Sequence, residues 1–278
     1  MALAFALVVA LITVVSVYVF LAKIWWFPVA ISTHGAAVDN QFVLTLIICG
    51  IIFVLAQLGL AWFVYKYRDK GDGRKVTYSH GNNSLETMWT TAAAILFIGL
   101  NLMGYRIWAA IHFTGPAPGA LKVQAQGQQF AWSFRYPGPD GQFGPTHVNL
   151  INDSTGNFYG IDRDHDATAK DDIVTATLGI PVNREVEVIL RSKDVGHSFF
   201  VRELRVHQDL VPGLEIPIHF TTTPDALNHS SDPKLPNGTY EIVCTQLCGL
   251  GHYKMRAFLK VMTEEDYEKW LQDQAASQ

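Results

Sequence analysis

The chain has 278 residues, with 21 lysines and arginines, 25 aspartates and glutamates, and a formal net charge of −4 at pH 7. This charge is too small to indicate a nucleic-acid partner. The chain has only three cysteines, and Cys49 lies alone in an apolar run, so the composition does not indicate a secreted disulfide scaffold.

Three uncharged segments near the N-terminus are long enough to cross a bilayer, which takes about 20 residues as a helix. They are Ala2–Ala22, Phe42–Tyr65 and Thr87–Tyr105. The first has no basic stretch before it and is longer than the apolar core of a signal peptide. We therefore expect an extra transmembrane helix or uncleaved signal over residues 1–24, followed by a transmembrane helical hairpin over residues 42–113.

The loop between the second and third spans is basic, whereas the loop before the second span has only Lys23. Its positive residues are Lys66, Arg68, Lys70, Arg74 and Lys75. The positive-inside rule places this loop in the cytoplasm and the chain after about Phe113 outside. For a bacterium, this predicts a multi-pass protein of the inner (plasma) membrane with a periplasmic domain.

After a breaker-rich segment at residues 115–119, the apolar pattern changes to a period of two, which is typical of half-buried strands. Many short strands without intervening helices predict an antiparallel sandwich or barrel over residues 119–262. The strands that we expect are Leu121–Phe134, His147–Ile151, Asp172–Leu178, Glu185–Arg191, Ser198–Val206, Ile216–Thr221, Thr239–Cys244 and Arg256–Val261.

The last segment, residues 263–278, is expected to form a helix and a short tail. Thr263 can cap the helix, and three acidic residues follow it where the helix dipole is positive. The helix is predicted over Thr263–Gln274.

Four metal-ligating side chains lie within twelve residues of one another, at Cys244, Cys248, His252 and Met255. Thiolates and thioethers favour Cu(I), and imidazole also accepts Cu(II). A mononuclear blue-copper site needs one cysteine, so the second thiolate allows two copper ions to share both sulfurs. His197 follows a glycine at the start of a predicted strand and could reach this loop from a neighbouring strand.

Three other interpretations of this loop remain open. The two cysteines could form a disulfide in an oxidising compartment. The loop could bind zinc, although thioether is a poor zinc ligand. It could also bind a single blue copper and leave one thiol unused. The following histidine and methionine favour the binuclear copper interpretation.

At these residues the chain resembles subunit II of the haem–copper oxidases, of the cytochrome c oxidase type with a CuA centre. The resemblance covers roughly residues 42–271. It includes the motifs at 67–68, 80–90 and 129–136, the spacing from His197 to the Asp-x-x-Pro-Gly motif at 209–213, and the copper loop. It implies a membrane-anchored all-β protein, with transmembrane helices followed by a cupredoxin-like Greek-key β-barrel.

The resemblance also implies how the metal is held. Cys244 and Cys248 would bridge two copper ions as thiolates. His252 and the backbone carbonyl of Gln246 would complete one copper, and His197 and Met255 the other. We further expect an apolar shell around the ligands that includes Phe199, Phe200, Leu247 and Leu250.

The implied function is electron transfer in a terminal respiratory oxidase. Cytochrome c or another periplasmic donor would deliver electrons at Phe130 or Trp132. The CuA centre would pass them to haem in subunit I, which lies in the lipid bilayer with other membrane subunits, reduces O2 to water and pumps protons. The chain has no C-x-x-C-H motif, so it carries no c-type haem of its own.

The chain departs from the family pattern at three places. Gln246 stands where many members have a glutamate that helps to bind Mg at the subunit I interface, and a neutral amide is a weaker ligand for that ion. Phe130 stands where many members have a tryptophan that receives the electron. The first apolar span has no counterpart in the two-helix pattern.

Two acidic features allow two interpretations each. Glu86 is either a solvated carboxylate that the dipole of the third helix stabilises, or, by resemblance, the cytoplasmic mouth of a proton path into the catalytic subunit. The acidic segment around Asp162, Asp164, Asp166, Asp171 and Asp172 is either a docking site for a basic cytochrome c or a solvated loop.

Two alternative functions remain open. The same module could serve a nitric oxide reductase, or the chain could be a membrane-tethered copper carrier or sensor. A quinol oxidase subunit II is disfavoured, because that type lacks the copper ligands found here.

Overall fold

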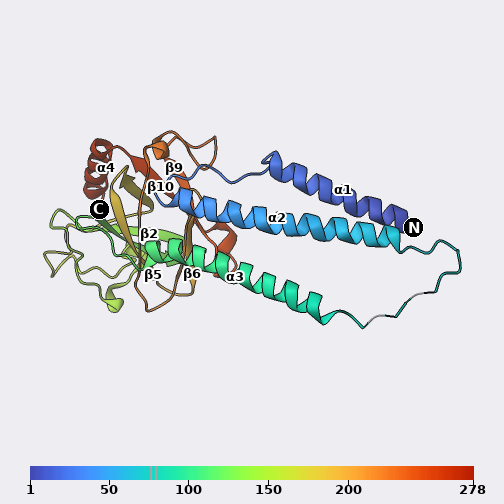
Figure 1. Cartoon of the computed structure of the whole chain (residues 1–278). Coiled ribbons are helices and arrows are strands. Elements are labelled where there is room, and N and C mark those ends of the chain that lie inside the picture. Colours follow the sequence, from blue (N-terminus) through green and yellow to red (C-terminus); the bar gives the residue numbers. More distant parts are fainter. Residues whose placement is uncertain (76, 79) are drawn as a thin grey trace. The chain divides into compact units, whose positions relative to one another are not determined.

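A computed structural model describes residues 1–75, 77–78 and 80–278 (Figure 1). The chain forms two compact units, one of residues 1–27 and 37–106, the other of residues 28–36 and 107–278. Two positions of the expected helical hairpin, 76 and 79, lie outside the described residues.

The first unit contains three helices that are long and apolar enough to cross a membrane. They are α1 (Ala2–Leu21), α2 (Gly35–Lys66) and α3 (Asn83–His112). Helix α2 begins seven residues before the expected span. At a rise of about 1.5 Å per residue, a helix of 32 residues is longer than the ~30 Å thickness of the hydrocarbon core. Their length and composition are those of a membrane anchor.

Side-chain contacts within this unit join the helices. Ala6 and Val9 of α1 pack against Ala61 of α2, and small residues of this kind let helix backbones approach closely in a membrane. The side chain of Gln41 on α2 donates a hydrogen bond to the carbonyl of Leu100 on α3, at 3.1 Å. This bond gives the side-chain amide a partner, which lipid hydrocarbon could not provide.

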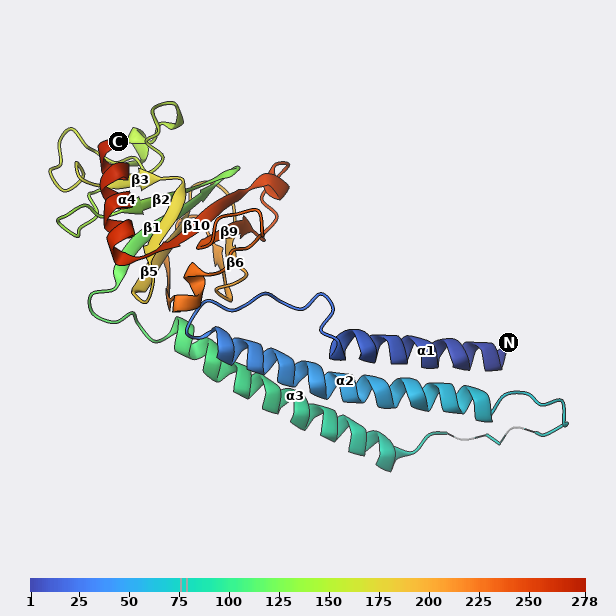
Figure 2. The same cartoon turned by 90° about the horizontal axis from the view of Figure 1, so that it is seen from above.

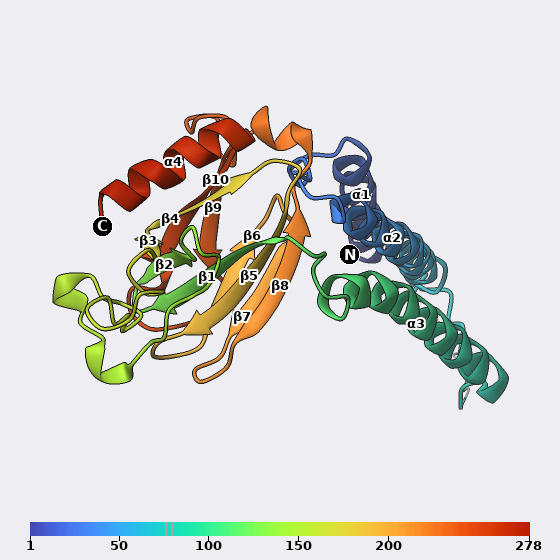
Figure 3. The ribbon, with the colours of Figure 1, turned by 90° about the vertical axis from the view of Figure 1, so that its left-hand side faces the viewer.

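The second unit is built from two twisted five-stranded sheets that enclose one core (Figure 3). One sheet has the order β3-β2-β1-β5-β8 and the other β4-β10-β9-β6-β7. The strands are β1 (Leu121–Gln128), β2 (Ala131–Tyr136), β3 (Ile173–Thr175), β4 (Thr177–Pro181), β5 (Glu185–Ser192), β6 (His197–Val201), β7 (Val206–Leu210), β8 (Ile216–Thr221), β9 (Thr239–Cys244) and β10 (Arg256–Met262). This is the cupredoxin-like β domain that the sequence led us to expect.

The sheets are not purely antiparallel, so that part of the prediction was wrong. β1 pairs with β5 in parallel, and β10 pairs with β4 in parallel. Each parallel pair joins strands far apart in the chain, which a Greek-key path permits because long connections return a strand to a distant neighbour.

Four expected strands were also wrong. Asp172–Leu178 is divided between β3 and β4, which belong to different sheets. Leu121–Phe134 is a hairpin, with Gln129 and Phe130 at the turn between β1 and β2. Ser198–Val206 is interrupted by a turn in which Arg205 has φ 59°, and β7 follows it. His147–Ile151 contains a short 3-10 helix, Val148–Leu150, because the carbonyl of His147 accepts from the Leu150 amide at 3.0 Å rather than from a neighbouring strand.

The segment that connects α1 to α2 packs on the β domain. Ile31 is completely buried in the core of that domain. Its amide donates to the carbonyl of Glu203 at 2.9 Å, and its carbonyl accepts from the amide of Thr223 at 2.7 Å. Ser32 pairs with Thr222 in an isolated antiparallel bridge. Residues 31–33 are therefore hydrogen-bonded to the β domain just beyond the end of β8, through an isolated bridge rather than a full strand.

The C-terminal helix α4 (Glu264–Ala276) covers the edge formed by β4 and β10. Thr263 caps it, as expected, by accepting a hydrogen bond from the Asp266 amide. Trp270 packs against the ring of Tyr136, with the ring centroids 5.7 Å apart. Gly179 makes this possible, since a Cβ there would lie 2.5 Å from the Trp270 ring.

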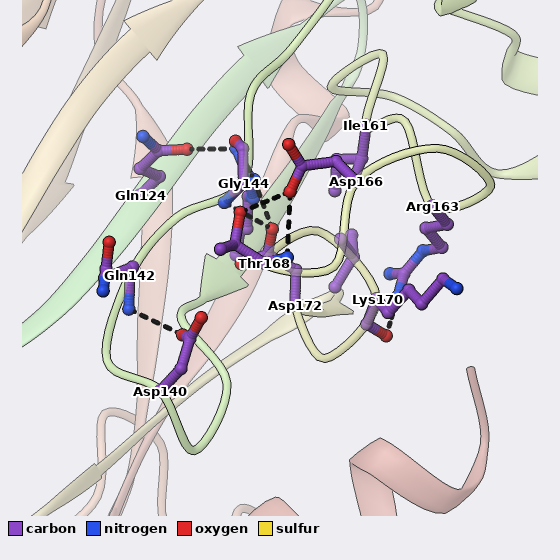
Figure 4. Close-up of polar contacts among 12 residues, drawn as sticks. Gln124, Asp140, Gln142, Gly144, Ile161, Arg163, Asp166, Thr168, Lys170 and Asp172 are labelled. Atoms are coloured by element: carbon purple, nitrogen blue, oxygen red, sulfur yellow. Dashed lines mark hydrogen bonds and ion pairs between the residues drawn. The ribbon is translucent and has the colours of Figure 1, made fainter.

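One ion pair is completely buried in the β domain. The guanidinium of Arg135 on β2 is paired with the carboxylate of Asp172, and both side chains are almost inaccessible to solvent. The same guanidinium also donates to the side chain of Gln124 and to the carbonyl of Gly144. Figure 4 labels Gln124, Gly144 and Asp172, which supply these three contacts. The pair fastens the 137–172 loop to the sheet.

We expect Asp172→Ala to destabilise the β domain by about 3–5 kcal/mol, because it leaves the guanidinium of Arg135 buried without a counter-charge. Urea unfolding of the full chain in detergent, followed by near-ultraviolet circular dichroism, would measure the change. Asp140→Ala, an exposed carboxylate of the same loop, is the control and should change stability by less than about 0.5 kcal/mol. Equal effects of the two substitutions would contradict a structural role for the pair.

Candidate metal centre

The expected copper loop connects β9 to β10, and the β6–β9 pairing brings His197 to it (Figure 2). Phe199 of β6 lies opposite Cys244 at the end of β9. The amide of Thr245 donates to the carbonyl of Ser198, which extends the pairing by one step. His197, two residues before Phe199, therefore lies beside the first residues of the loop although it is 47 positions from Cys244.

The structure brings all six expected ligands together. The sulfur of Cys244 lies 3.9 Å from Nδ1 of His197 and 3.2 Å from the carbonyl oxygen of Gln246. The sulfur of Cys248 lies 3.6 Å from Nδ1 of His252 and 3.8 Å from Sδ of Met255. Among the described residues, only His197, Cys244 and Cys248 form a group of three histidine, cysteine or acidic ligands within 4.8 Å of one another.

The spacing of the two sulfurs suits a shared metal. They are 3.9 Å apart, far beyond the ~2.05 Å of a disulfide bond, and both thiols are free. A metal can bind two sulfurs at once only if they are closer than twice the metal–sulfur distance, which is about 2.3 Å for zinc. The pair meets this condition, so the donor set fits a thiolate-bridged copper centre, and the disulfide interpretation does not hold in this structure.

The ring of His197 is completely buried and held in one orientation. Its Nε2 lies 2.8 Å from the carboxylate of Asp194. A carboxylate only accepts, so Nε2 carries the hydrogen and Nδ1 keeps its lone pair toward Cys244. A Cβ on Gly127 would lie 3.0 Å from the ring, so glycine at this position leaves room for it.

Asp194 is held as a carboxylate. Burial raises its pKa, but hydrogen bonds from the Gln129 amide, the His197 ring and the Val195 amide outweigh burial and leave the pKa below its usual value. A permanent negative charge at this position favours a positively charged metal site and orients its histidine ligand.

The thiol of Cys248 is protonated in the metal-free protein at neutral pH. Burial, together with the neighbouring thiol of Cys244, raises its pKa to about 11. The side chain of Gln129 donates to the carbonyl of Cys248 at 2.6 Å and fixes the middle of the loop. A metal must therefore displace a proton from Cys248 before it can bind the sulfur.

Aromatic side chains lie on one side of the ligands. Trp132 is buried, with its ring centroid 6.3 Å from that of His197 and 5.8 Å from that of Phe199. Phe130 is 38% exposed. Its ring lies against Gly251, where a Cβ would come within 2.4 Å of it. Phe130 thus covers the copper loop at the surface, and Trp132 lies in the interior beside His197.

The expected apolar shell is only partly correct. Phe199 is completely buried in the core and Phe200 is partly buried. Leu247 and Leu250, however, are 76% and 96% exposed, and Tyr253 is 78% exposed. These side chains point to solvent because the loop lies at the end of the sheet and its interior is filled by its own sulfur atoms and imidazoles.

The acidic segment does not form one exposed patch. Asp172 is buried in the pair with Arg135, so it cannot face a partner. Asp162 accepts from the ring of His165, and Asp166 from the hydroxyl of Thr168. Glu86 lies exposed in the first turn of α3, next to Gly81.

Sequence reasoning missed two residues that orient the ligands, Asp194 and Gln129. Asp194 stands three positions before His197, and an acidic residue so close to a candidate ligand was a usable signal. Gln129 gave no such signal, because its partner, Cys248, lies 119 residues away in the chain.

Comparisons with known proteins agree with this site. A family model described as "Cytochrome C oxidase subunit II, periplasmic domain" matches residues 121–262. The alternative cytochrome c oxidase subunit 2 of Bradyrhizobium diazoefficiens is 35% identical over 274 residues, which cover 98% of this chain and 92% of that protein. Cytochrome c oxidase subunit 2 of Thermostichus vulcanus is 29% identical over 269 residues, covering 87% of this chain and 76% of that protein.

Solved structures are also similar. The periplasmic domain of subunit II of a cytochrome oxidase of Bradyrhizobium japonicum aligns with a TM-score of 0.39 and 21% identity, over 58% of this chain and 97% of that chain. The alignment with the first relative above includes nearly all of this chain. The first apolar span, which has no counterpart in the two-helix pattern, therefore has a counterpart in that relative.

We expect the copper affinity of the metal-free chain to rise with pH. Because the thiol of Cys248 is protonated below pH ~11, each proton that copper displaces should raise the apparent affinity about tenfold per pH unit between pH 7 and 9. Competition with a chelator of known affinity would measure this. The slope should persist in Cys49→Ser, which changes the third cysteine, and an affinity independent of pH would contradict a thiolate ligand.

Proposed function

The chain belongs to the cytochrome c oxidase subunit II family, and on that premise we propose that it receives electrons for a haem–copper oxidase at a binuclear CuA centre. The observation that carries this proposal is the pair of free thiol sulfurs, 3.9 Å apart, with two imidazoles, a thioether and a backbone carbonyl beside them.

Each copper would take one imidazole and one weaker ligand. His252 and the carbonyl oxygen of Gln246 would hold one metal, His197 and Met255 would hold the other, and the thiolates of Cys244 and Cys248 would be ligands to both. Bound there, the metal pair supplies a one-electron redox centre. The two thiolates in common would let one electron spread over both ions.

The contribution of the protein is a site that changes little between redox states. Cys244 ends β9 and Met255 precedes β10, and the Cys244 amide donates to the Met255 carbonyl at 3.2 Å. His197 is held by Asp194. Both sulfurs and His197 are buried, so water does not reorganise around them. Ligands fixed before the electron arrives keep the reorganisation energy low.

An electron donor would dock over the exposed side of the copper loop. Phe130, Leu247, Leu250 and Tyr253 expose apolar surface there, and interfaces of proteins are enriched in such aromatic residues. We propose that electrons from cytochrome c or another periplasmic donor pass through Phe130 to the loop. Trp132, buried beside His197, offers a second route.

The orientation of the chain follows from its basic loop. Lys66, Arg68 and Lys70 follow α2, so we place this end in the cytoplasm of a bacterium and the copper domain in the periplasm. Haem in subunit I would then receive the electron within the membrane, and O2 would be reduced there. Gln246 contributes its backbone carbonyl, and its neutral side chain makes an interface Mg ion unsupported.

We expect Phe130→Ala to slow electron transfer from a reduced c-type cytochrome by about tenfold, because it removes the aromatic surface over the loop. Stopped-flow absorbance of the copper-loaded full chain in detergent would measure the rate. Val148→Ala removes an exposed apolar side chain from a different loop and should leave the rate unchanged. An unchanged rate in Phe130→Ala with the copper spectrum intact would place the donor elsewhere.

Glu86→Gln should slow steady-state turnover of the assembled oxidase while copper reduction stays fast, if Glu86 collects protons on the cytoplasmic side. Oxygen consumption and stopped-flow reduction would separate the two steps. Asp69→Asn is the control, since it neutralises a carboxylate of the loop that connects α2 to α3. Turnover equal to that of the control would remove the proton role, and absence of any haem-containing partner on purification would favour a copper carrier over an oxidase.

A further inference from the structure

The exposed side of the copper loop carries little charge. Residues 245–255 contain no aspartate or glutamate, and neither do the turn residues 129–130. The ring of Phe130 lies against the loop, since a Cβ on Gly251 would come within 2.4 Å of it. The turn and the loop therefore form one continuous surface, which we call the loop surface, and its one lysine is Lys254.

Apolar side chains cover the loop surface. The exposed ones are Phe130, Leu247, Leu250 and Tyr253. The ammonium of Lys254 lies 5.3 Å from the centroid of the Tyr253 ring, so even the lysine extends over an aromatic face. A contiguous exposed apolar patch of this kind marks an interaction site, because soluble domains otherwise keep such patches small.

Two carboxylates beside the loop surface already have basic partners. Glu241, on the strand that leads into the loop, has Oε1 3.4 Å from Nη1 of Arg256. Asp153 is paired with Lys193, whose ammonium also lies 3.3 Å from the side-chain oxygen of Gln128, next to the turn. Each pair cancels its own charge, so neither leaves a negative site for a lysine of a partner protein.

Asp194, a third carboxylate near the loop, serves the metal site. It accepts from the ring of His197 at 2.8 Å and from the amide of Gln129 at 2.7 Å. Its charge therefore offsets that of the metals whose ligand it orients. The exposed carboxylates Asp164 and Asp209 belong to other segments, the 162–172 loop and β7.

This distribution of charge decides which partner the loop surface can attract. A ring of lysines on a donor associates faster when it meets a negative potential, and salt then screens that gain. The loop surface offers one lysine and, within residues 129–130 and 245–255, no carboxylate. A lysine-rich partner would lose hydration of its charges there without gaining a counter-charge, whereas an apolar partner gains buried area.

We propose that the electron donor is a c-type cytochrome whose haem edge is ringed by uncharged, apolar side chains, and that it docks on the loop surface. This inference rests on the proposed electron-transfer function and specifies its donor. In the transfer, one ferrous haem gives one electron to the copper pair, so the haem becomes ferric and no bond forms or breaks. Phe130 and Leu250 supply the apolar contact, and Lys254 disfavours a lysine-rich rim.

A matched pair of probes tests the proposal. One is a lysine-rich mitochondrial cytochrome c, and the other is the same protein with its lysines acetylated, which keeps the haem and removes the positive charges. Nuclear magnetic resonance of each isotope-labelled, ferric probe, titrated with the oxidised, copper-loaded full chain in detergent, gives a dissociation constant without electron transfer. The acetylated probe should bind at least as tightly as the native one, with less than about a twofold change between about 10 and 200 mM salt.

Substitutions on the loop surface locate the contact. Leu250→Ser should weaken binding of the acetylated probe by about tenfold, because it removes a leucine that the complex buries. Val148→Ser, which changes an exposed apolar residue of another loop, is its control and should not. Lys254→Glu should make the native probe bind more tightly than the acetylated one. Lys260→Glu makes the same charge change on an exposed residue of β10 and should leave the preference as it is in the parent chain.

Three results would overturn the proposal: tighter binding of the native probe at low salt that is lost as salt rises, no binding of either probe, or unchanged affinity in Leu250→Ser. Loss of native-probe binding in Asp164→Asn or Asp209→Asn would place the docking site on those acidic segments instead. Stopped-flow mixing with the ferrous probes separates this inference from the proposed function. Probes that bind as expected but do not reduce the copper would contradict the electron transfer and leave the docking surface standing.

Discussion

The candidate copper site depends on the pairing of β6 with β9. This pairing places Phe199 opposite Cys244 and so brings His197 beside the loop, although the two ligands are 47 residues apart. The pairing of β9 with β10 holds the two ends of the copper loop together, because Val243 lies opposite Arg256. The loop ligands are confined between these two residues. Strand pairing of this kind is formed with the fold, before any metal binds.

For the proposed function, a site assembled by the sheets would need little rearrangement when it takes up or passes on an electron. The buried neighbours strengthen this effect. Asp194 fixes the ring of His197, Gln129 fixes the carbonyl of Cys248, and Gly127 leaves the space that the ring occupies. The exposed side of the loop is different, since Leu247, Leu250 and Phe130 present apolar surface there. Both sulfurs, His197 and Met255 are thus buried, while the surface above them is apolar and exposed.

Local patterns predicted part of this structure. β8 and β9 have the bounds that alternation and turn residues predicted, and β5 and β10 each differ by one residue. The spacing within the loop identified four candidate copper ligands, because one short segment carries two cysteines, a histidine and a methionine. The parallel pairs and the β1–β2 turn could not be predicted in this way. Pairing between distant strands leaves no local period, and Gln129-Phe130 contains no glycine, asparagine or proline to indicate a turn.

Contacts between distant residues account for the other differences. The 28–36 segment has no strand pattern of its own, yet Ile31 is buried because the end of β8 offers it unpaired backbone groups. Asp172 counted as an exposed acid in the sequence, but Arg135, 37 residues away, pairs with it in the core. Asp194 and Gln129 are recognisable only once the loop and β6 lie together.

Electron paramagnetic resonance of the copper-loaded full chain tests the central claim most directly. With one electron removed from the fully reduced centre, the spectrum should show hyperfine splitting from a single unpaired electron shared equally by two copper nuclei. A spectrum split by one copper nucleus would contradict the account, because it would mean that Cys244 and Cys248 do not bridge a metal pair.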